Sequence, residues 1–390
     1  MKRGIFVQWS TTYYPSSILF DTDSTRIHSY YTIPHALLRQ ALISHGILLC
    51  PIEEFGEHKR ADFLISVDLP ISKIEIQRAC DKLLNPGGPR ILIVMESAHS
   101  MPELLCKSEF SDWSHVIHYS SLLPSSIKHY NYTLPSNLSY LSVQGQDYTH
   151  DRHRLVGMMS TNKPSRLTAT ISRRVRSHRS AYRYDSAGVF RWLRQEDGLR
   201  LRRHFSKRLA KLIPDDFLVF GGQWDGSSFA PHHRVLKPKA NPCSKGPTSC
   251  NSISIIQGFK YFFATENLIG DDGYLTEKLF NVIRAGSVPI YKPATDSRVF
   301  PFTGAHANLP FIDLRMVKNN SASQLVSLLR NITPNTYQKY LQAGKEFLSS
   351  QLAVSHTPCA YAQSMSTLLS DLILSSINEK PLNNVRRQSH

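Results

Sequence analysis

The stretch KYFFATENLIGDDGYLTEKLFNVIRAGSVPIY, residues 260–291, decides the fold of this chain. It begins with an aromatic, apolar run that predicts a buried strand. A polar, glycine-containing loop follows. From Thr276 onward, apolar residues recur at helical spacing, and Gly286 stands where a left-handed helix C-cap is expected. Residues 287–291 predict the next strand. Strand, loop, helix and strand form a βαβ unit, which requires a parallel sheet.

The loop of this unit is the first candidate binding site. Ligands of open α/β sheets bind at the carboxyl ends of the strands, where Glu266, Asn267 and Tyr274 are expected. Lys278 falls in the first helical turn, where the helix dipole disfavours a cation, whereas Glu277 suits that position. An anionic ligand resolves the conflict, because backbone amides and Lys278 can share a phosphate. The alternative is a solvated lysine on a surface helix.

The rest of the chain repeats the alternation of strands and helices. Apolar runs that are continuous rather than alternating predict strands covered on both faces of a parallel sheet. The predicted strands are 4–9, 47–52, 61–67, 90–95, 155–159, 217–220 and 311–313, and the predicted helices are 33–46, 74–84, 199–213, 322–329, 336–348 and 361–377. In helix 199–213, Leu201, Phe205, Leu209 and Leu212 are expected to face inward. A length of 390 residues favours two domains, 1–150 and 151–377, followed by a basic, disordered tail, 378–390.

Charge and cysteine content narrow the class of protein. The formal net charge of +16 predicts attraction to a nucleotide diphosphate, an anionic membrane face or a nucleic acid. Six scattered cysteines without a C-x-x-C pair are typical of reduced thiols in a cytoplasmic protein. The apolar run at the start is too short for a signal peptide, and no stretch is long and apolar enough to span a bilayer.

The same central stretch carries a family resemblance. Its elements are Glu266-Asn267, then Tyr274-Leu275-Thr276-Glu277-Lys278-Leu279, then Ala285-Gly286-Ser287-Val288-Pro289-Ile290-Tyr291. They resemble the donor-binding signature of the α-1,3/4-fucosyltransferases, glycosyltransferase family 10. The resemblance implies an α/β, GT-B-like fold with two Rossmann-like domains facing a cleft. Residues 1–150 would form the acceptor side and 151–377 the GDP-sugar donor domain.

The resemblance also implies an activity. The expected reaction is inverting transfer of fucose from GDP-fucose to a hydroxyl of a glycan or glycolipid, in α-1,3 or α-1,4 linkage. No cofactor is required, and a divalent metal at most stimulates. The lack of a signal anchor is typical of a bacterial-type member, so the expected location is cytoplasmic, peripheral on an anionic inner membrane that holds lipopolysaccharide or O-antigen acceptors.

Such a transfer needs a base for the acceptor hydroxyl and positive charge for the leaving diphosphate. Glu96 directly follows a predicted strand, and the resemblance makes it the base; a solvated strand-end carboxylate and the neighbouring His99 are the alternatives. Glu277 can favour positive charge on the sugar. In addition to Lys278, the resemblance implies four donor-binding residues in the second domain: Ser160, Asn162, Arg174 and Arg176. Arginines at i and i+2 do not share a helical face, so at most one of that pair points at the ligand.

Other interpretations stay open. Asp271-Asp272 could be a metal site, but a Gly-Asp-Asp-Gly turn explains both residues without one. A relative using another nucleotide sugar is the enzymatic alternative. A nucleic-acid-binding protein using the arginine-rich region 166–211 lacks a supporting motif, so no nucleic acid partner is expected. The presence of Glu96, Glu277 and Lys278 speaks against an inactive glycan-binding relative.

Overall fold

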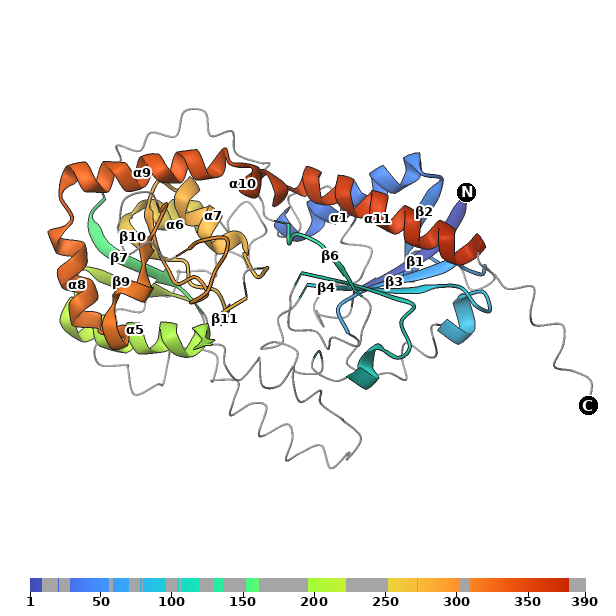
Figure 1. Cartoon of the computed structure of the whole chain (residues 1–390), viewed down its shortest axis with the longest axis horizontal. Coiled ribbons are helices and arrows are strands. Elements are labelled where there is room, and N and C mark those ends of the chain that lie inside the picture. The colour runs from blue at the N-terminus through green and yellow to red at the C-terminus, as the bar shows by residue number, and fades with distance from the viewer. Residues whose placement is uncertain are drawn as a thin grey trace, which may run out of the picture.

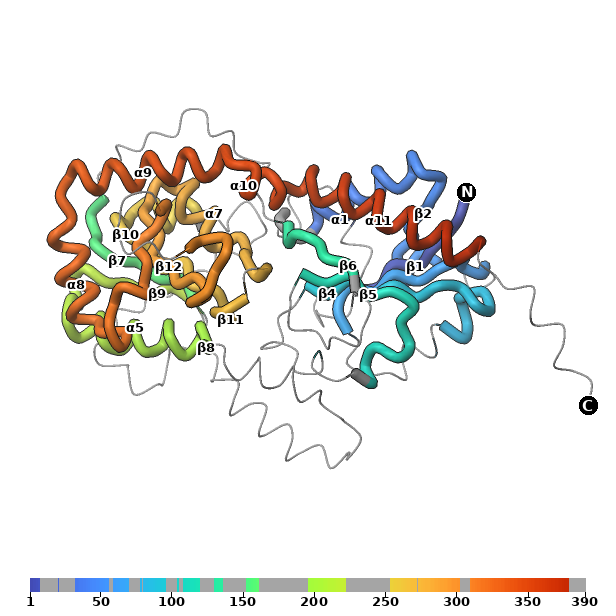
Figure 2. Tube along the Cα trace, in the orientation of Figure 1, coloured from blue at the N-terminus to red at the C-terminus, as the bar shows by residue number. Residues whose placement is uncertain are grey.

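The structure is a computed structural model that describes residues 1–8, 20, 29–55, 59–69, 78, 80–95, 104, 107–119, 129–135, 152–160, 196–221, 252–271, 273–301 and 309–378. Two sheets, each accompanied by helices, lie side by side along the long axis of the molecule (Figure 1). Followed from blue to red, the chain completes the first sheet, then the second, and returns to the first with its last described helix (Figure 2).

The first sheet has six strands in the described chain, in the order β2-β1-β3-β4-β5-β6, and all pair in parallel. The strands are β1 (Lys2–Gln8), β2 (Ile47–Pro51), β3 (Phe63–Val67), β4 (Arg90–Val94), β5 (His115–His118) and β6 (His129–Asn131). Successive residues of β3 and β4 enter different apolar clusters, with Ile65 and Ile93 in one and Leu64 and Leu92 in the other. Both faces of the sheet are therefore covered, which confirms the prediction from continuous apolar runs.

The second sheet is also parallel, in the order β13-β12-β10-β7-β9. Its strands are β7 (Arg154–Met159), β9 (Phe217–Phe220), β10 (Phe259–Phe263), β12 (Val288–Tyr291) and β13 (Ile312–Asp313). A short antiparallel pair, β8 (Glu196–Asp197) with β11 (Leu268–Ile269), lies beside it. The parallel pairing of β10 with β12 confirms the βαβ unit predicted from residues 260–291.

The described helices are α1 (Ser29–Ser44), α5 (Gly198–Leu212), α6 (Ser252–Gln257), α7 (Glu277–Arg284), α8 (Ala322–Asn331), α9 (Pro334–Leu348), α10 (Gln351–Ser355) and α11 (Pro358–Asn378). Short 3-10 helices span Ile52–Glu54, Lys107–Phe110, Leu314–Met316 and Lys318–Asn320. α7 begins directly after its N-cap Thr276, where the sequence predicted the helical pattern to open, and ends at Arg284. Gly286 follows the C-cap residue Ala285 in the predicted left-handed conformation, with a φ of 68° that favours glycine. The predicted helix 74–84 falls mostly outside the described residues.

Both sheets share one topological feature. The first strand has the second strand on one side and the third on the other, as in β2-β1-β3 and β9-β7-β10. The chain therefore leaves the two central strands in opposite directions, which opens a crevice at their carboxyl ends. In the second sheet this switch point lies between β7 and β10, where the candidate donor site was predicted.

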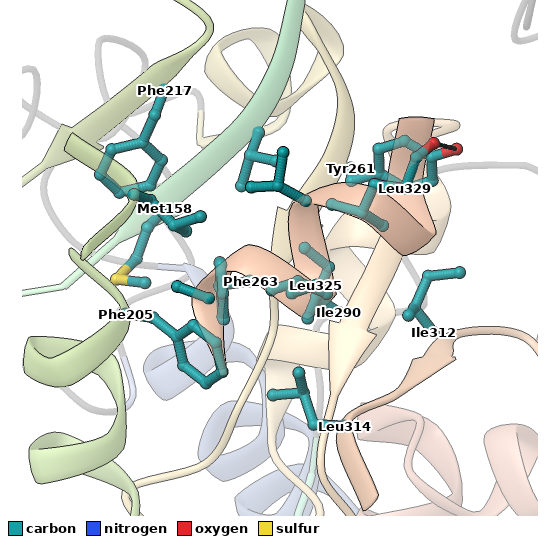
Figure 3. Packing of buried hydrophobic residues seen from close by; sticks show 14 of the residues in the cluster. Met158, Phe205, Phe217, Tyr261, Phe263, Ile290, Ile312, Leu314, Leu325 and Leu329 are labelled. Carbon is teal, nitrogen blue, oxygen red and sulfur yellow. Dashed lines mark hydrogen bonds between the residues drawn. The ribbon is translucent and has the colours of Figure 1, made fainter. Parts of the chain in front are cut away.

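The core of the second half packs α5 and α8 against the sheet (Figure 3). Phe205 of α5 is fully buried, and its ring lies 5.3 Å from that of Phe263. Leu201 and Leu209 share this core, as predicted. Leu212, expected to face inward, is 49% exposed instead. It is the last residue of α5 and, unlike the other three, does not belong to the apolar cluster of the second half.

The last helix joins the two halves. All but the last residue of α11 falls within the span 151–377 assigned to the donor domain, yet α11 packs on α1 of the first half. Its Tyr361, Met365 and Leu369 share an apolar cluster with Leu38 and Leu42 of α1. Buried contacts rather than chain order define a core, so α11 is structurally part of the first domain. The boundary at residue 150 stays a prediction.

Candidate functional site

The candidate site centres on the donor loop, residues 264–276, which connects β10 to α7. The loop leaves β10 on the switch-point side, next to β7. Ser160, the first residue after β7, is buried, and its backbone N–H donates to the carbonyl of Phe220 at 2.8 Å. The chain order and strand order thus bring the ends of β7 and β10 together, as the sequence predicts for Ser160 and Glu266.

Glu266 is the anchor of the donor loop. Its side chain is 2% exposed and accepts hydrogen bonds from both the N–H and the hydroxyl of Thr276, at 2.8 and 2.7 Å. Lys278 Nζ donates to Glu266 Oε2 at 3.1 Å and to Thr276 Oγ1 at 2.9 Å. The carboxylate therefore ties the start of the loop to the start of α7 and fixes the position of the ammonium group.

Burial and ion pairing act in opposite directions on this pair. Burial raises the pKa of Glu266 above its ordinary value, although Lys278 and the hydrogen bonds from Thr276 oppose the shift. Burial lowers the pKa of Lys278, but the carboxylates of Glu266 and Glu277 outweigh it and leave that pKa raised. Lys278 therefore carries its positive charge throughout the neutral range.

The helix-dipole conflict noted in the sequence has an internal answer. Glu277 Oε1 lies 3.6 Å from Lys278 Nζ, so two carboxylates flank the ammonium group at the start of α7. An anionic ligand is therefore not needed to hold the lysine there. Lys278 is nevertheless 24% exposed, and an ammonium has three donors, of which two are used by the hydrogen bonds described above. It is held in place with capacity for one more acceptor.

Arg202 is a site residue that the sequence analysis missed. It is 4% exposed in α5, and its Nη2 donates to Asn267 Oδ1 at 2.5 Å. Burial lowers its pKa, opposed by nearby Glu266 and Tyr274. Its Nε has no hydrogen-bond partner in the described part of the chain. Helical periodicity could have indicated its burial, because Phe205 at i+3 and Leu209 at i+7 place Arg202 on the inward face of α5.

The start of α5 presses directly on the donor loop. A Cβ on Gly198 would lie 1.8 Å from the carbonyl oxygen of Glu266, so only glycine fits there. Asp197 caps the helix by accepting from the N–H groups of Leu199 and Arg200 at 2.9 and 3.0 Å. Cap and close contact together fix the helix that carries Arg202 relative to Glu266.

Tyr274 connects the donor loop to the first domain. It belongs to an interdomain cluster with Tyr119, Leu134 and Leu268, against which Met95 and Tyr132 pack. The rings of Tyr119 and Tyr274 lie 5.4 Å apart. Met95 directly precedes the predicted base Glu96, which lies outside the described residues.

A pocket adjoins the donor loop on the side of β12. It is lined by residues of the donor loop and by β12 with the segment that follows it: Leu268, Ile269, Gly270, Asp271, Tyr274, Leu275, Tyr291, Lys292, Pro293, Ala294, Val299 and Phe300. Lys292 Nζ lies 2.5 Å from Glu196 Oε2 of β8. The pocket is therefore walled by aromatic and aliphatic groups with both signs of charge close by.

The structure brings together five of the predicted site residues: Glu266, Asn267, Tyr274, Glu277 and Lys278. Four others, Glu96, Asn162, Arg174 and Arg176, lie outside the described residues, and their roles stay predictions. Ser160 is placed at the switch point, but its contact with a ligand is untested.

The described residues give no sign of a metal centre. Within them, no group of three or more His, Cys, Asp or Glu side chains could hold an ion. Asp271 Oδ1 accepts from the N–H of Gly273 at 3.1 Å, as expected for the turn interpretation of this sequence. Among the same residues, no helix is both long and apolar enough to cross a membrane.

Comparison with solved structures addresses the fold. An α-glucosyltransferase solved with UDP-glucose and DNA containing an abasic site superposes with a TM-score of 0.53 at 10% identity, covering 95% of this chain and 99% of that one. An α1,3-fucosyltransferase solved with GDP gives a TM-score of 0.45 at 11% identity, covering 87% of this chain and 81% of that one. With the two parallel sheets, the first match confirms the predicted GT-B-like fold.

Comparison with protein families addresses the kind of enzyme. No curated protein matches the sequence. A family model described as glycosyltransferase family 10 (fucosyltransferase) C-term matches residues 238–385, which include the whole donor loop and α7. This chain is therefore a glycosyltransferase, and its residues 238–385 match the C-terminal part of glycosyltransferase family 10, the fucosyltransferase family.

Proposed function

We propose that the protein transfers fucose from GDP-fucose to a hydroxyl of a glycan acceptor, with inversion, in α-1,3 or α-1,4 linkage. The observation that carries the proposal is the position of Lys278, held by Glu266 and Thr276 at the switch point of the domain that the family model matches. A fixed cation at a helix start is suited to a leaving diphosphate.

Two cations converge on the donor loop in this proposal. Lys278 neutralises one phosphate oxygen as the bond between the sugar C1 and the diphosphate breaks. Arg202 supplies the second charge: its Nη2 is bonded to Asn267, and its buried Nε has no hydrogen-bond partner in the described part of the chain. Because both cations are held before the donor binds, little reorganisation is needed when charge develops on the leaving group.

The bond-forming step needs a base on the acceptor side. Glu96 takes the proton of the acceptor hydroxyl, whose oxygen then attacks C1 of fucose from the face opposite the diphosphate. One displacement inverts C1, releases GDP and requires no metal ion in this scheme. Glu277 at the start of α7 favours the positive charge that the sugar develops.

The acceptor is proposed from charge and chemistry alone. A formal net charge of +16 favours binding to an anionic membrane surface, where lipid-linked glycans such as lipopolysaccharide or O-antigen precursors would be presented. We therefore propose a glycolipid acceptor and a peripheral membrane location.

A donor panel tests the proposal. The full chain is incubated with GDP-fucose, GDP-mannose, UDP-glucose or UDP-galactose and a mixture of oligosaccharide acceptors, and nucleotide release is measured. Among the four donors, only GDP-fucose is expected to give nucleotide release. Glu96→Gln should reduce the rate of this release by at least about a hundredfold while GDP still binds. Turnover of another sugar nucleotide would replace fucose in the proposal. Binding of DNA with no nucleotide release would favour the nucleic-acid alternative.

A further inference from the structure

Among the described glycines, Gly273 is the one whose added Cβ would meet the backbone of the other domain. A Cβ built on this residue of the donor loop would lie 2.0 Å from the carbonyl oxygen of Tyr119 and 3.0 Å from its carbonyl carbon. Tyr119 follows β5 in the first domain, and Gly273 precedes Tyr274 in the second. Both obstructing atoms are backbone atoms, which cannot rotate away as the end of a side chain could.

The space in front of Gly273 requires glycine at this position, because the obstructing atoms belong to the backbone of Tyr119. The requirement arises only while the two domains stay in contact.

The groups around this contact lead to both halves of the proposed chemistry. The ring of Tyr119 lies 5.4 Å from that of Tyr274, whose loop is anchored by Glu266. Met95 packs on the same interdomain cluster, and Glu96 is the next residue in the chain. A change in the distance between Gly273 and Tyr119 would therefore change the distance between Tyr274 on the donor side of the interdomain cluster and Met95, next to Glu96, on the acceptor side.

We infer that the Gly273–Tyr119 contact sets the separation of the two domains, and so positions the acceptor side against the donor. Gly273 is in this sense a positioning residue, and the inference rests on the proposed two-domain transfer reaction. Because a displacement of about 1 Å can cost a reaction roughly a hundredfold in rate, a methyl group at this contact is enough to show the effect.

The test is Gly273→Ala in the full chain. The matched control is Gly258→Ala in the same domain, where a Cβ would meet only the carbonyl oxygen of Ile255 at 3.5 Å. GDP affinity, measured by calorimetry, should stay within about twofold of wild type in both variants, because the donor site lies within one domain. The kcat for transfer should fall by about a hundredfold in Gly273→Ala only. A kcat within about twofold of wild type would overturn the inference.

Small-angle X-ray scattering provides a readout that does not need activity. A larger radius of gyration is expected for Gly273→Ala than for wild type or Gly258→Ala, and identical scattering from all three would also overturn the inference. If wild type transfers no sugar, the proposed function has failed and the scattering alone decides. Should Gly273→Ala not fold, Tyr119→Ala keeps the carbonyl in place but removes the ring that packs on Tyr274 beside the contact, and it is expected to lower kcat while GDP binding stays unchanged.

Discussion

Lys278 Nζ lies 3.1 Å from Oε2 of Glu266, a carboxylate that is 2% exposed and that also accepts two hydrogen bonds from Thr276. Glu266 comes from the loop that follows strand β10, and Lys278 comes from the start of helix α7, 12 residues later. The pair holds a cation in a fixed place before any ligand arrives, which is the feature that a donor site for a sugar diphosphate needs.

Removal of this cation should weaken nucleotide binding more than it weakens the fold. Lys278→Ala is expected to raise the Kd for GDP about thirtyfold, corresponding to roughly 2 kcal/mol for one charge-assisted contact. Lys260→Ala is the control, because Lys260 is exposed on the neighbouring strand β10. Isothermal titration calorimetry measures both, and equal affinities in the two variants would exclude Lys278 from the diphosphate site.

Arg202 is expected to separate binding from stability. Arg202 carries a desolvation cost and a buried Nε without a hydrogen-bond partner in the described chain, so an apolar side chain of similar length in Arg202→Met should keep or raise the melting temperature. The same variant should bind GDP at least about tenfold more weakly, and Arg202→Lys should not restore the affinity, because an ammonium lacks the planar fork. Arg200→Met, on the exposed side of α5, serves as the control. A marked loss of stability with unchanged GDP affinity would give Arg202 a structural role instead.

His356 predicts a specific pH dependence of stability. It is 3% exposed, its Nδ1–H donates to the carbonyl of Leu134 at 2.7 Å, and burial lowers its pKa from 6.5 to about 4. Between these two values the unfolded chain takes up a proton that the folded chain refuses. Stability should therefore fall as the pH drops from 6.5 toward 4, by about 3 kcal/mol from this group.

The variant His356→Asn tests whether the loss of stability at low pH comes from His356. Asparagine can donate to Leu134 but does not titrate, so the difference in unfolding free energy between wild type and variant should change over this pH range and level off below it. Urea unfolding at a series of pH values measures the difference. A constant difference would assign the acid sensitivity to other groups.

Phe205 and Leu212 lie on the same helix, α5, but should contribute very differently to the stability of the fold. Phe205→Ala is expected to cost about 3–5 kcal/mol, because the side chain is fully buried against Phe263. Leu212→Ala, in the same helix but 49% exposed, should cost less than about 1 kcal/mol. Chemical denaturation compares them, and similar losses would contradict the packing of α5 seen in Figure 3.

Much of the fold follows from local sequence signals. The continuous apolar runs predicted the parallel sheets, and Thr276 and Gly286 predicted both ends of α7. The exposure of Leu212 could not be predicted, because helical periodicity gives the face of a residue but not whether the last turn of a helix is still covered by its neighbours. The packing of α11 on α1 was also missed, since an apolar helix at the end of a chain does not reveal which core it completes.

The candidate site was predicted only where its residues are adjacent in sequence. The signature from Glu266 to Lys278 predicted the donor-loop side of the site. The structure joins Glu266, Thr276 and Lys278 of this signature in one hydrogen-bonded network. Arg202 approaches from 65 residues away, and its basic neighbours in sequence conceal it among exposed charges. The contact of Gly273 with Tyr119 links two domains, and no local pattern encodes such a contact.

The most direct test of the central claim is calorimetric titration of the full chain with GDP, UDP and CMP. Saturable binding of GDP with one site per chain, and at least about tenfold weaker binding of UDP and CMP, is the predicted result. Equal affinity for all three nucleotides would contradict a GDP-specific donor site. The absence of GDP binding by folded protein, with and without acceptor present, would contradict the assignment of the Glu266–Lys278 network to a sugar-nucleotide site.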